Sequence, residues 1–346
     1  MSHILDEVSG RVLLVGGYGV GNIGDEAILS GLLDQVSPNI SELTVVTHDA
    51  EETRSLHASS VPSSVSFSPI EPSPRRLTAE LIKNDHFVFG GGGLFSRYMG
   101  PYAAKIPYYA IAAKSLFKSV HWEALGVYPS TPRNTLKALS FVMNRSSTVS
   151  VRDPVSQRFL SSEGVRDVAL VDDAATKLSF DSDRGEKLLE EQGVNTNEPV
   201  IGVAARRVLN DSINDQLQTS YLQVSKELNK RGYNIVFIPF CRHSYAPIGK
   251  DHEVCETLES KVDQSTTVSY SHPTDALSIV SAFDGLLATR LHSMIFAHIC
   301  ETPFVAIEYA DKVSSLLKYY GKEDHGIDLT EARTGKILSK MDELVL

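Results

Sequence analysis

The chain has 346 residues, of which 42% are hydrophobic and 22% are charged, and its formal net charge is −10. This length predicts two domains or one large one, with a core that can form without disulfides. The acidic balance argues against a nucleic-acid partner, because proteins that bind nucleic acids usually carry a basic excess on one face. It does not exclude a small anion held in a local pocket.

The composition also predicts a cytoplasmic protein. The three cysteines, Cys241, Cys255 and Cys300, form no paired framework, which favours a reducing compartment. The first ten residues, MSHILDEVSG, contain acids and lack the apolar core of a signal peptide. We expect no membrane span, because no apolar run reaches the about 18 residues that a span needs. Peripheral association with a membrane stays open.

Taken in chain order, the predicted elements alternate between strands and helices. The expected strands are residues 11–16, 42–49, 86–93, 147–153, 167–173, 200–206, 233–240, 266–271 and 285–290. Helical patterns lie between most of them, including one that begins near Asp25 and one that runs from Pro101 to Phe117. Val61–Pro74 is rich in proline and serine and is expected to be a loop.

This alternation is typical of parallel sheets with helices on both faces. The polar stretch Phe180–Pro199 separates two alternating halves. We therefore predict an α/β fold with two Rossmann-like doubly wound domains, residues 1–180 and 181–346. If the domains face each other, a ligand would bind in the cleft, outside the carboxyl ends of the strands.

The first loop carries a glycine pattern typical of dinucleotide binding. Gly19, Gly21 and Gly24 have the spacing G-x-G-x-x-G after the first expected strand. Asp49 lies at the end of the next strand, where a ribose-binding acid is expected. An NAD(P)-dependent oxidoreductase is therefore one hypothesis for this chain.

Two acidic residues at the start of the following helix argue against that hypothesis. Asp25 and Glu26 suit the positive end of a helix dipole, but they would repel a phosphate at the same place. Asp25 as a simple helix cap is the alternative. A cap accounts neither for Asn22 nor for the density of glycines.

The same loop, read with three later stretches, resembles the polysaccharide pyruvyl transferase family. Gly16–Leu29 carries a Gly-Asn-x-Gly-Asp-Glu turn, and Phe87–Phe95 resembles the second glycine loop of the family. Thr148–Leu160 contains Arg-Asp-x-x-Ser, and Ala288–Val313 contains Arg-Leu-His followed by Tyr-x-x-Lys-Val. The chain departs from the family at Trp122–Pro129, where relatives often carry Gln-Gly-x-Gly-Pro.

The resemblance implies a fold like that of the two-Rossmann-domain (GT-B) glycosyltransferases. It also implies transfer of the pyruvyl group of phosphoenolpyruvate to hydroxyls of a sugar or lipid-linked glycan, usually as a cyclic ketal, with release of phosphate. It implies neither a metal nor a cofactor. The N-terminal domain would be the acceptor side, and the C-terminal domain would bind phosphoenolpyruvate.

Phosphoenolpyruvate is a small anion with a carboxylate and a phosphate, so its site needs cations, ideally arginines. Arg206 and Arg207 lie at the end of one expected strand, Arg290 and His292 lie at the end of another, and Lys312 follows a further expected strand, residues 304–309. Carboxyl ends of parallel strands open on one edge of the sheet. We therefore predict that Arg206, Arg207, Arg290 and Lys312 bind the donor, although each alone could be a surface charge.

The reaction also requires an acid for the enol carbon and a base for the sugar hydroxyl. His292 is the predicted acid, because the ordinary pKa of histidine lies close to neutral pH. Asp25 is the predicted base, because a carboxylate at a helix N-terminus stays ionised. Four further residues are predicted to let backbone approach a ligand closely, although tight turns would also explain the glycines: Asn22, Gly24, Gly91 and Gly92.

Three other hypotheses stay open beside the oxidoreductase. The chain could be a nucleotide-sugar glycosyltransferase of the same architecture, or a binding protein without catalytic activity. Zinc could be held by residues with soft ligand atoms, namely Cys241, His243, His252 and Cys255. Four tyrosines, namely Tyr98, Tyr102, Tyr108 and Tyr109, are expected to pack mainly within or on a helix, with stacking on sugar rings as the alternative.

Overall fold

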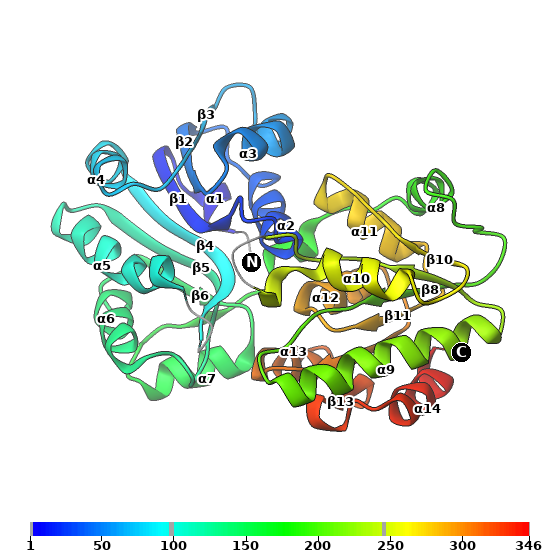
Figure 1. Ribbon diagram of the computed structural model, residues 1–346. Coiled ribbons are helices and arrows are strands. Elements are labelled where there is room, and N and C mark those ends of the chain that lie inside the picture. Colours follow the sequence, from blue (N-terminus) through cyan, green and yellow to red (C-terminus); the bar gives the residue numbers. More distant parts are fainter. Residues whose placement is uncertain (1–2, 97–99, 244–246, 346) are drawn as a thin grey trace. The chain divides into compact units, whose positions relative to one another are not determined.

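The computed structural model describes residues 3–96, 100–243 and 247–345. Its chain divides into two compact units. Unit 1 comprises Met1–Val20 and Asp25–Lys177, and unit 2 comprises Gly21–Gly24 and Leu178–Leu346 (Figure 1). The short segment Gly21–Gly24 therefore belongs to the second unit although it lies near the start of the chain.

Unit 1 alternates strands and helices along most of its length. Its elements are α1 (Ile4–Glu7), β1 (Gly10–Tyr18), α2 (Ile23–Leu33), β2 (Ile40–Thr47), α3 (Ala50–His57), η1 (Ala58–Ser60), β3 (Ser66–Ile70), α4 (Pro74–Lys83), β4 (His86–Phe95), α5 (Pro101–Ser115), β5 (Ser119–Val127), α6 (Arg133–Met143), β6 (Thr148–Val151), α7 (Pro154–Ser162), β7 (Ala169–Leu170) and η2 (Ala174–Lys177), where η denotes a 3-10 helix. Part of the expected loop 61–74 is the edge strand β3 and the start of α4.

The strands of unit 1 form one parallel sheet in the order β3-β2-β1-β4-β5-β6-β7. The chain builds outward from β1 to β3 and then returns to pair β4 with the other side of β1. The point between β1 and β4 is thus the topological switch point, where open α/β sheets bind ligands beyond the carboxyl ends of the strands.

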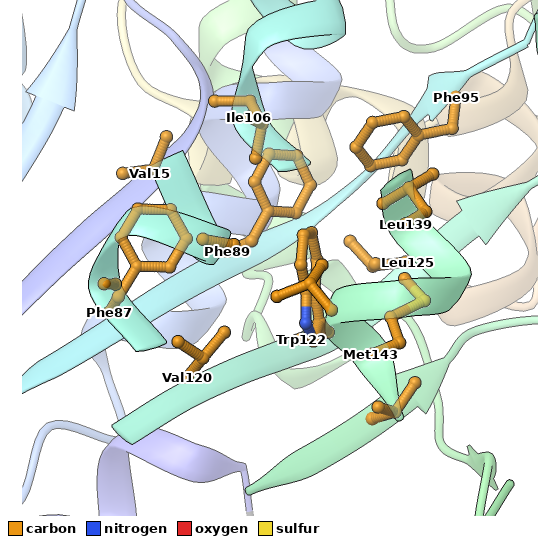
Figure 2. Close-up of a cluster of buried hydrophobic side chains, with 14 of the residues drawn as sticks. Val15, Phe87, Phe89, Phe95, Ile106, Val120, Trp122, Leu125, Leu139 and Met143 are labelled. Carbon is orange, nitrogen blue, oxygen red and sulfur yellow. The ribbon is translucent and has the colours of Figure 1, made fainter. Parts of the chain in front are cut away.

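Side chains alternate between the two faces of this sheet, and both faces are covered. Leu13 and Val15 of β1 pack into one apolar cluster with α4, α5, α6 and α7, whereas Val12 and Leu14 pack into another with α1 and α2. Figure 2 shows the first cluster, in which Trp122 lies close to the ring of Phe89, with centroids 5.7 Å apart. Burial on both faces explains the nearly continuous apolar runs of the strands.

Unit 2 repeats the same pattern with shorter strands. Its elements are α8 (Ser182–Glu190), β8 (Val200–Ala204), α9 (Asp211–Lys230), β9 (Asn234–Phe237), η3 (Pro247–Gly249), α10 (Asp251–Glu259), β10 (Ser265–Thr267), α11 (Pro273–Ser281), β11 (Gly285–Ala288), α12 (Leu291–Ile299), β12 (Phe304–Glu308), α13 (Asp311–Tyr319), η4 (Glu323–His325), β13 (Gly326–Asp328), η5 (Leu329–Glu331) and α14 (Thr334–Leu344).

The second sheet is also parallel, with the order β10-β9-β8-β11-β12-β13 and a switch point between β8 and β11. Helices α9, α10 and α14 supply side chains to the apolar cluster on one face, and Figure 1 shows α9 and α14 side by side. Helices α8 and α11 pack against each other. The predicted fold class, α/β with two Rossmann-like doubly wound domains, is confirmed.

The tyrosines near the second glycine loop mostly serve packing. Tyr102 and Tyr109 of α5 pack against the core of unit 1, and Tyr108 is 56% exposed. Tyr98 lies outside the described residues. Within the ranges that the structure describes, no helix combines the length and the hydrophobicity needed to cross a membrane.

A glycine permits the close contact between α8 and α11, and this gives a prediction for stability. A Cβ built on Gly185 would lie 1.9 Å from the carbonyl oxygen of Ser278, which is backbone and cannot rotate away. Gly185→Ala should therefore lower the free energy of unfolding by about 1–3 kcal/mol, as overpacking does. Urea denaturation followed by circular dichroism measures the change.

Gly335→Ala is the matched control, because a Cβ at this helical glycine of α14 meets nothing within 4 Å. It should leave the protein unchanged or stabilise it by up to about 1 kcal/mol through helix propensity. Equal denaturation midpoints for the two variants would contradict the predicted helix contact.

Candidate functional site

Three neighbouring strands of unit 2 end beside one another at the switch point. Strand β11 pairs with β8 on one side and with β12 on the other, with Ala288 opposite Ala204 and Ala306. A cationic residue follows each strand, namely Arg206, Arg290 and Lys312. The predicted alternation of strands and helices thus brings these residues to one edge of the sheet.

Tyr309 lies among these cations, directly after β12. The guanidinium carbon of Arg206 lies 4.1 Å from the centroid of the Tyr309 ring, and the ammonium nitrogen of Lys312 lies 5.4 Å from it. Both distances are those of cation–π interactions. Arg206, Arg290, Lys312 and Tyr309 are called the cation cluster below.

Arg290 is held by a buried carboxylate. Its Nε and Nη2 atoms donate to the two oxygens of Asp251, at 2.8 and 2.6 Å. A further hydrogen bond from Nη2 reaches the carbonyl of Ile248. Asp251 is fully buried at the start of α10. This two-pronged pairing fixes the plane of the guanidinium as well as its position.

The pKa values of the residues in the cation cluster are shifted by the positive charges close to one another. Burial lowers the pKa of Arg206, and repulsion from Arg290 lowers it further. Burial also opposes the charge of Arg290, but Asp251 outweighs it and raises the pKa. Burial disfavours a phenolate at Tyr309, yet Lys312, Arg206 and Arg290 together lower the pKa of Tyr309 to about 8. The cluster therefore stabilises negative charge at its centre.

Two helices begin at the same edge. Helix α12 begins at Leu291 and α13 at Asp311, so their N-terminal N–H groups add partial positive charge beside the cations. The hydroxyl of Ser293 donates to the carbonyl of Arg290 at 2.7 Å and fixes the strand-to-helix turn. The arrangement is suited to a small anion bearing phosphate or carboxylate groups.

His292 lies in the first turn of α12 and is 8% exposed. Its imidazole packs directly against Gly24, where a Cβ would lie 2.0 Å from the Nδ1 atom. Position 24 therefore cannot hold a larger residue unless the histidine ring moves. The glycine motif and the Arg-Leu-His motif meet within unit 2.

The segment Gly21–Gly24 is held by backbone hydrogen bonds to the stretch that follows β9. The N–H of Ile23 donates to the carbonyl of Phe240 at 3.0 Å, and the N–H of Arg242 donates to the carbonyl of Gly21 at 2.7 Å. The side-chain oxygen of Asn22 accepts the N–H of Gly24 at 3.3 Å. Asn22 thus shapes the turn that presents Gly24.

Asp25 belongs to unit 1 and lies at the switch point of the first sheet. Its carboxylate oxygens are close to Gly17 of β1 and Gly92 of β4, 3.3 and 3.6 Å from the Cβ positions that these glycines lack. Gly91 and Gly92 have φ values of +76° and +90°, which favour glycine. The two predicted loops of unit 1 therefore meet at Asp25.

Glu26 has a structural role in the first loop. One of its oxygens accepts the N–H of Gly19 at 2.7 Å, and the other is paired with the buried ring of His57 at 3.0 Å. A dinucleotide phosphate would need such N–H donors for itself. Asp49, the proposed ribose-binding acid, caps α3 by accepting the N–H of Glu52.

The Arg-Asp-x-x-Ser stretch is also structural. Arg152 forms a fully buried ion pair with Asp173 at 2.6 Å. Asp153 accepts the N–H of Ser156 at 2.8 Å and the hydroxyl of Tyr128 at 3.0 Å, and so caps α7. These contacts fix a strand-to-helix turn beside the second glycine loop.

Arg207 is not part of the cation cluster. Its guanidinium lies 3.8 Å from Glu253, and it lines a cavity of 640 Å³ between α9 and α10. Arg206 packs on the ring of Tyr309 whereas Arg207 lies beside Glu253, so the two side chains diverge. The donor-binding role predicted for Arg207 gains no support from this position.

The residues considered for zinc do not form a ligand set. Across the part of the chain that the structure describes, no group of three or more His, Cys, Asp or Glu residues could hold a metal ion. Burial raises the pKa of the Cys255 thiol well above its ordinary value, which disfavours the thiolate that zinc requires.

Sequence reasoning missed two members of the site. Tyr309 was visible only as part of the Tyr-x-x-Lys-Val pattern, and nothing in the sequence indicated that cations would surround its ring. Asp251 lies between His243 and His252 in the sequence, and no motif singles it out. Its pairing with Arg290 joins residues 39 positions apart, which a local pattern does not reveal.

The chain is similar in sequence to known proteins over most of its length. A model of the family described as Polysaccharide pyruvyl transferase matches residues 22–311 of the chain. The amylovoran biosynthesis protein AmsJ of Erwinia amylovora is 22% identical over 382 residues, covering 96% of this chain and 91% of that protein.

Solved structures share the architecture. UDP-GlcNAc 2-epimerase from Neisseria meningitidis has a TM-score of 0.63 and 14% identity, over 96% of this chain and 90% of its own. The UDP-GlcNAc 2-epimerase from Methanocaldococcus jannaschii has a TM-score of 0.61 and 11% identity, over 96% of this chain and 92% of its own. ADP-heptose lps heptosyltransferase II of E. coli has a TM-score of 0.55 and 12% identity, over 96% of this chain and 98% of its own. At such identities the likeness shows the fold alone.

The buried pairing of Arg290 with Asp251 predicts a large effect on stability. Asp251→Ala should lower the free energy of unfolding by about 3–5 kcal/mol, because it leaves a mostly buried guanidinium without its anion. Denaturant titration measures the loss, and the double variant Asp251→Ala with Arg290→Met should recover part of it. Asp342→Ala, which breaks the exposed pair with Arg231, should cost less than about 1 kcal/mol. Similar losses for both single variants would contradict the prediction.

Proposed function

The chain belongs to the polysaccharide pyruvyl transferase family, and we propose that it moves the pyruvyl group of phosphoenolpyruvate onto hydroxyls of a sugar or lipid-linked glycan. The observation that carries the proposal is the cation cluster at the switch point of unit 2. Its guanidinium and ammonium groups suit both the phosphate and the carboxylate of this donor. Unit 2 would thus bind the donor, and unit 1 would serve the acceptor.

Arg206, Arg290 and Lys312 are the proposed donor ligands. Arg290 is oriented by Asp251, and Arg206 is buried against the ring of Tyr309. Preorganised cations of this kind lose little side-chain entropy when an anion binds. They would also stabilise the negative charge that collects on phosphate as it leaves.

The proposed chemistry has three proton transfers. His292 gives a proton to the terminal enol carbon, which becomes a methyl group and leaves the adjacent carbon electron-poor. A sugar hydroxyl then attacks that carbon and loses its proton to Asp25. The bond between that carbon and the phosphate oxygen breaks, and phosphate leaves. A second hydroxyl then attacks the carbon and closes the cyclic ketal, and its proton passes to the departing phosphate.

The positions of these two residues support the proposed roles. His292 follows Arg290 by two residues, in the turn that opens α12 beside the cation cluster. Asp25 lies within unit 1 between the ends of β1 and β4, close to Gly17 and Gly92. Its carboxylate lies in the first turn of α2, at the positive end of the helix dipole. Asn22, Gly24, Gly91 and Gly92 are the proposed loop positions near the acceptor.

Donor binding tests the proposal directly. Phosphoenolpyruvate should raise the unfolding temperature of the full chain, with a stabilisation of about 2.7 kcal/mol at one hundred times its Kd. The same measurement with UDP-GlcNAc tests the glycosyltransferase hypothesis, and with NADH it tests the oxidoreductase hypothesis. Binding of either nucleotide without binding of phosphoenolpyruvate would overturn the proposal. Release of inorganic phosphate with methyl pyranosides as acceptors, followed with the mass of the sugar product, then tests transfer.

Replacing either proton-transfer residue should slow the chemical step without weakening donor binding. We expect His292→Gln and Asp25→Asn each to lower kcat by about 10²–10⁴-fold, the usual contribution of acid–base catalysis. Phosphate release measures kcat, and calorimetry measures the Kd of phosphoenolpyruvate. Two matched controls, His298→Gln on the same helix as His292 and Asp34→Asn at the exposed position directly after α2, should keep full activity. Full turnover in Asp25→Asn with unchanged affinity would remove that residue from the mechanism.

A further inference from the structure

Tyr309 has no role in the chemistry described above, yet it occupies the centre of the cation cluster. The guanidinium of Arg206 lies over one face of its ring, 4.1 Å from the centroid. Its phenol oxygen accepts a hydrogen bond from Lys312. A tyrosine that served packing alone would be expected among apolar side chains. Here the neighbours are the same cations that are proposed to bind the donor.

The charged groups around Tyr309 come from every element that meets at this edge. They are Arg206 after β8, Arg290 before α12, Lys312 in α13, Asp251 at the start of α10, and Glu308 and Asp311 beside Tyr309 in the chain. Asp251 is engaged with Arg290 through two hydrogen bonds. The three cations therefore dominate the field at the phenol oxygen, which favours its ionisation.

The two protonation states of Tyr309 leave different amounts of positive charge for a ligand. The neutral phenol interacts with Arg206 and Lys312 through its ring and its oxygen but neutralises neither. The phenolate would form an internal anion at the same cations. A phosphorylated ligand would then compete with a negative charge that belongs to the protein.

We propose that Tyr309 sets the anion affinity of the cation cluster: as a phenol it leaves the cations available to the donor, and as a phenolate it competes with the donor for them. This inference rests on the proposed function for the identity of the donor. Its physical content, an anion site governed by a phenol, applies equally to a simple dianion such as sulfate. Tyr309 is a positioning residue in this scheme.

Linkage gives the expected size of the effect. Tyr309 ionises with a pKa of about 8, and a bound anion should return this pKa toward the ordinary value of about 10. By reciprocity, the anion should then bind about tenfold more weakly at pH 9 than at pH 7. Sulfate keeps both of its charges over this range, so the loss would belong to the protein.

The experiment compares the full-length wild-type chain with Tyr309→Phe, which keeps the ring and removes the hydroxyl. Calorimetry gives the Kd of sulfate and of phosphoenolpyruvate at pH 7 and pH 9, and absorbance at the phenolate band follows tyrosine ionisation. We expect the tenfold loss and an early-ionising phenol in the wild type, and neither in Tyr309→Phe. Tyr319→Phe, at the exposed end of α13, is the control and should behave as the wild type.

The outcomes separate this inference from the proposed function. Equal pH dependence in the wild type and Tyr309→Phe, with phosphoenolpyruvate bound, would overturn the role of Tyr309 and leave the function standing. A Tyr309-dependent loss for sulfate with no binding of phosphoenolpyruvate would support the role of Tyr309 and overturn the donor. Should Tyr309→Phe fail to fold, a wild-type absorbance titration without a phenol ionising near pH 8 would still overturn the inference.

Discussion

Repulsion between Arg206 and Arg290 at the end of one parallel sheet is the constraint on which the rest of this site depends. Arg206, Arg290 and Lys312 would each pay a large desolvation penalty if they were buried without an anion. One carboxylate, Asp251, compensates Arg290 through two hydrogen bonds. For Arg206 and Lys312 the structure supplies a polarisable ring, that of Tyr309. The positive charge of buried Arg206 is a reason for an anionic ligand to bind here.

The same constraint explains the glycine loop near the start of the chain. A histidine beside the cations needs space for its imidazole, and Gly24 supplies that space by lacking a Cβ. The N–H of Gly19, which a phosphate-binding loop would offer to its ligand, is taken by Glu26. The same spacing of glycines that is typical of dinucleotide binding therefore serves here to bring backbone against a side chain.

Much of this arrangement could be predicted from the sequence, because strand ends in a parallel sheet share an edge. That rule alone brings Arg206, Arg290 and Lys312 together once the strands are recognised. It could not separate Arg206 from Arg207, because which of two successive residues points inward depends on the exact register of the strand end. Nor could it find Asp251, whose partner is fixed by how α10 packs on the sheet and not by any local pattern.

The fold itself does not decide what binds at the switch point, since doubly wound sheets serve many ligands. The residue types at the switch point decide which ligand binds, because each class of ligand requires different side chains at the same edge of the sheet. A nucleotide needs a surface for its base, usually an apolar or aromatic one. One aromatic ring at this edge, that of Tyr309, has a guanidinium on its face at 4.1 Å. That face is therefore unavailable for stacking, and the cations around it favour a compact ligand whose charge lies in phosphate and carboxylate groups.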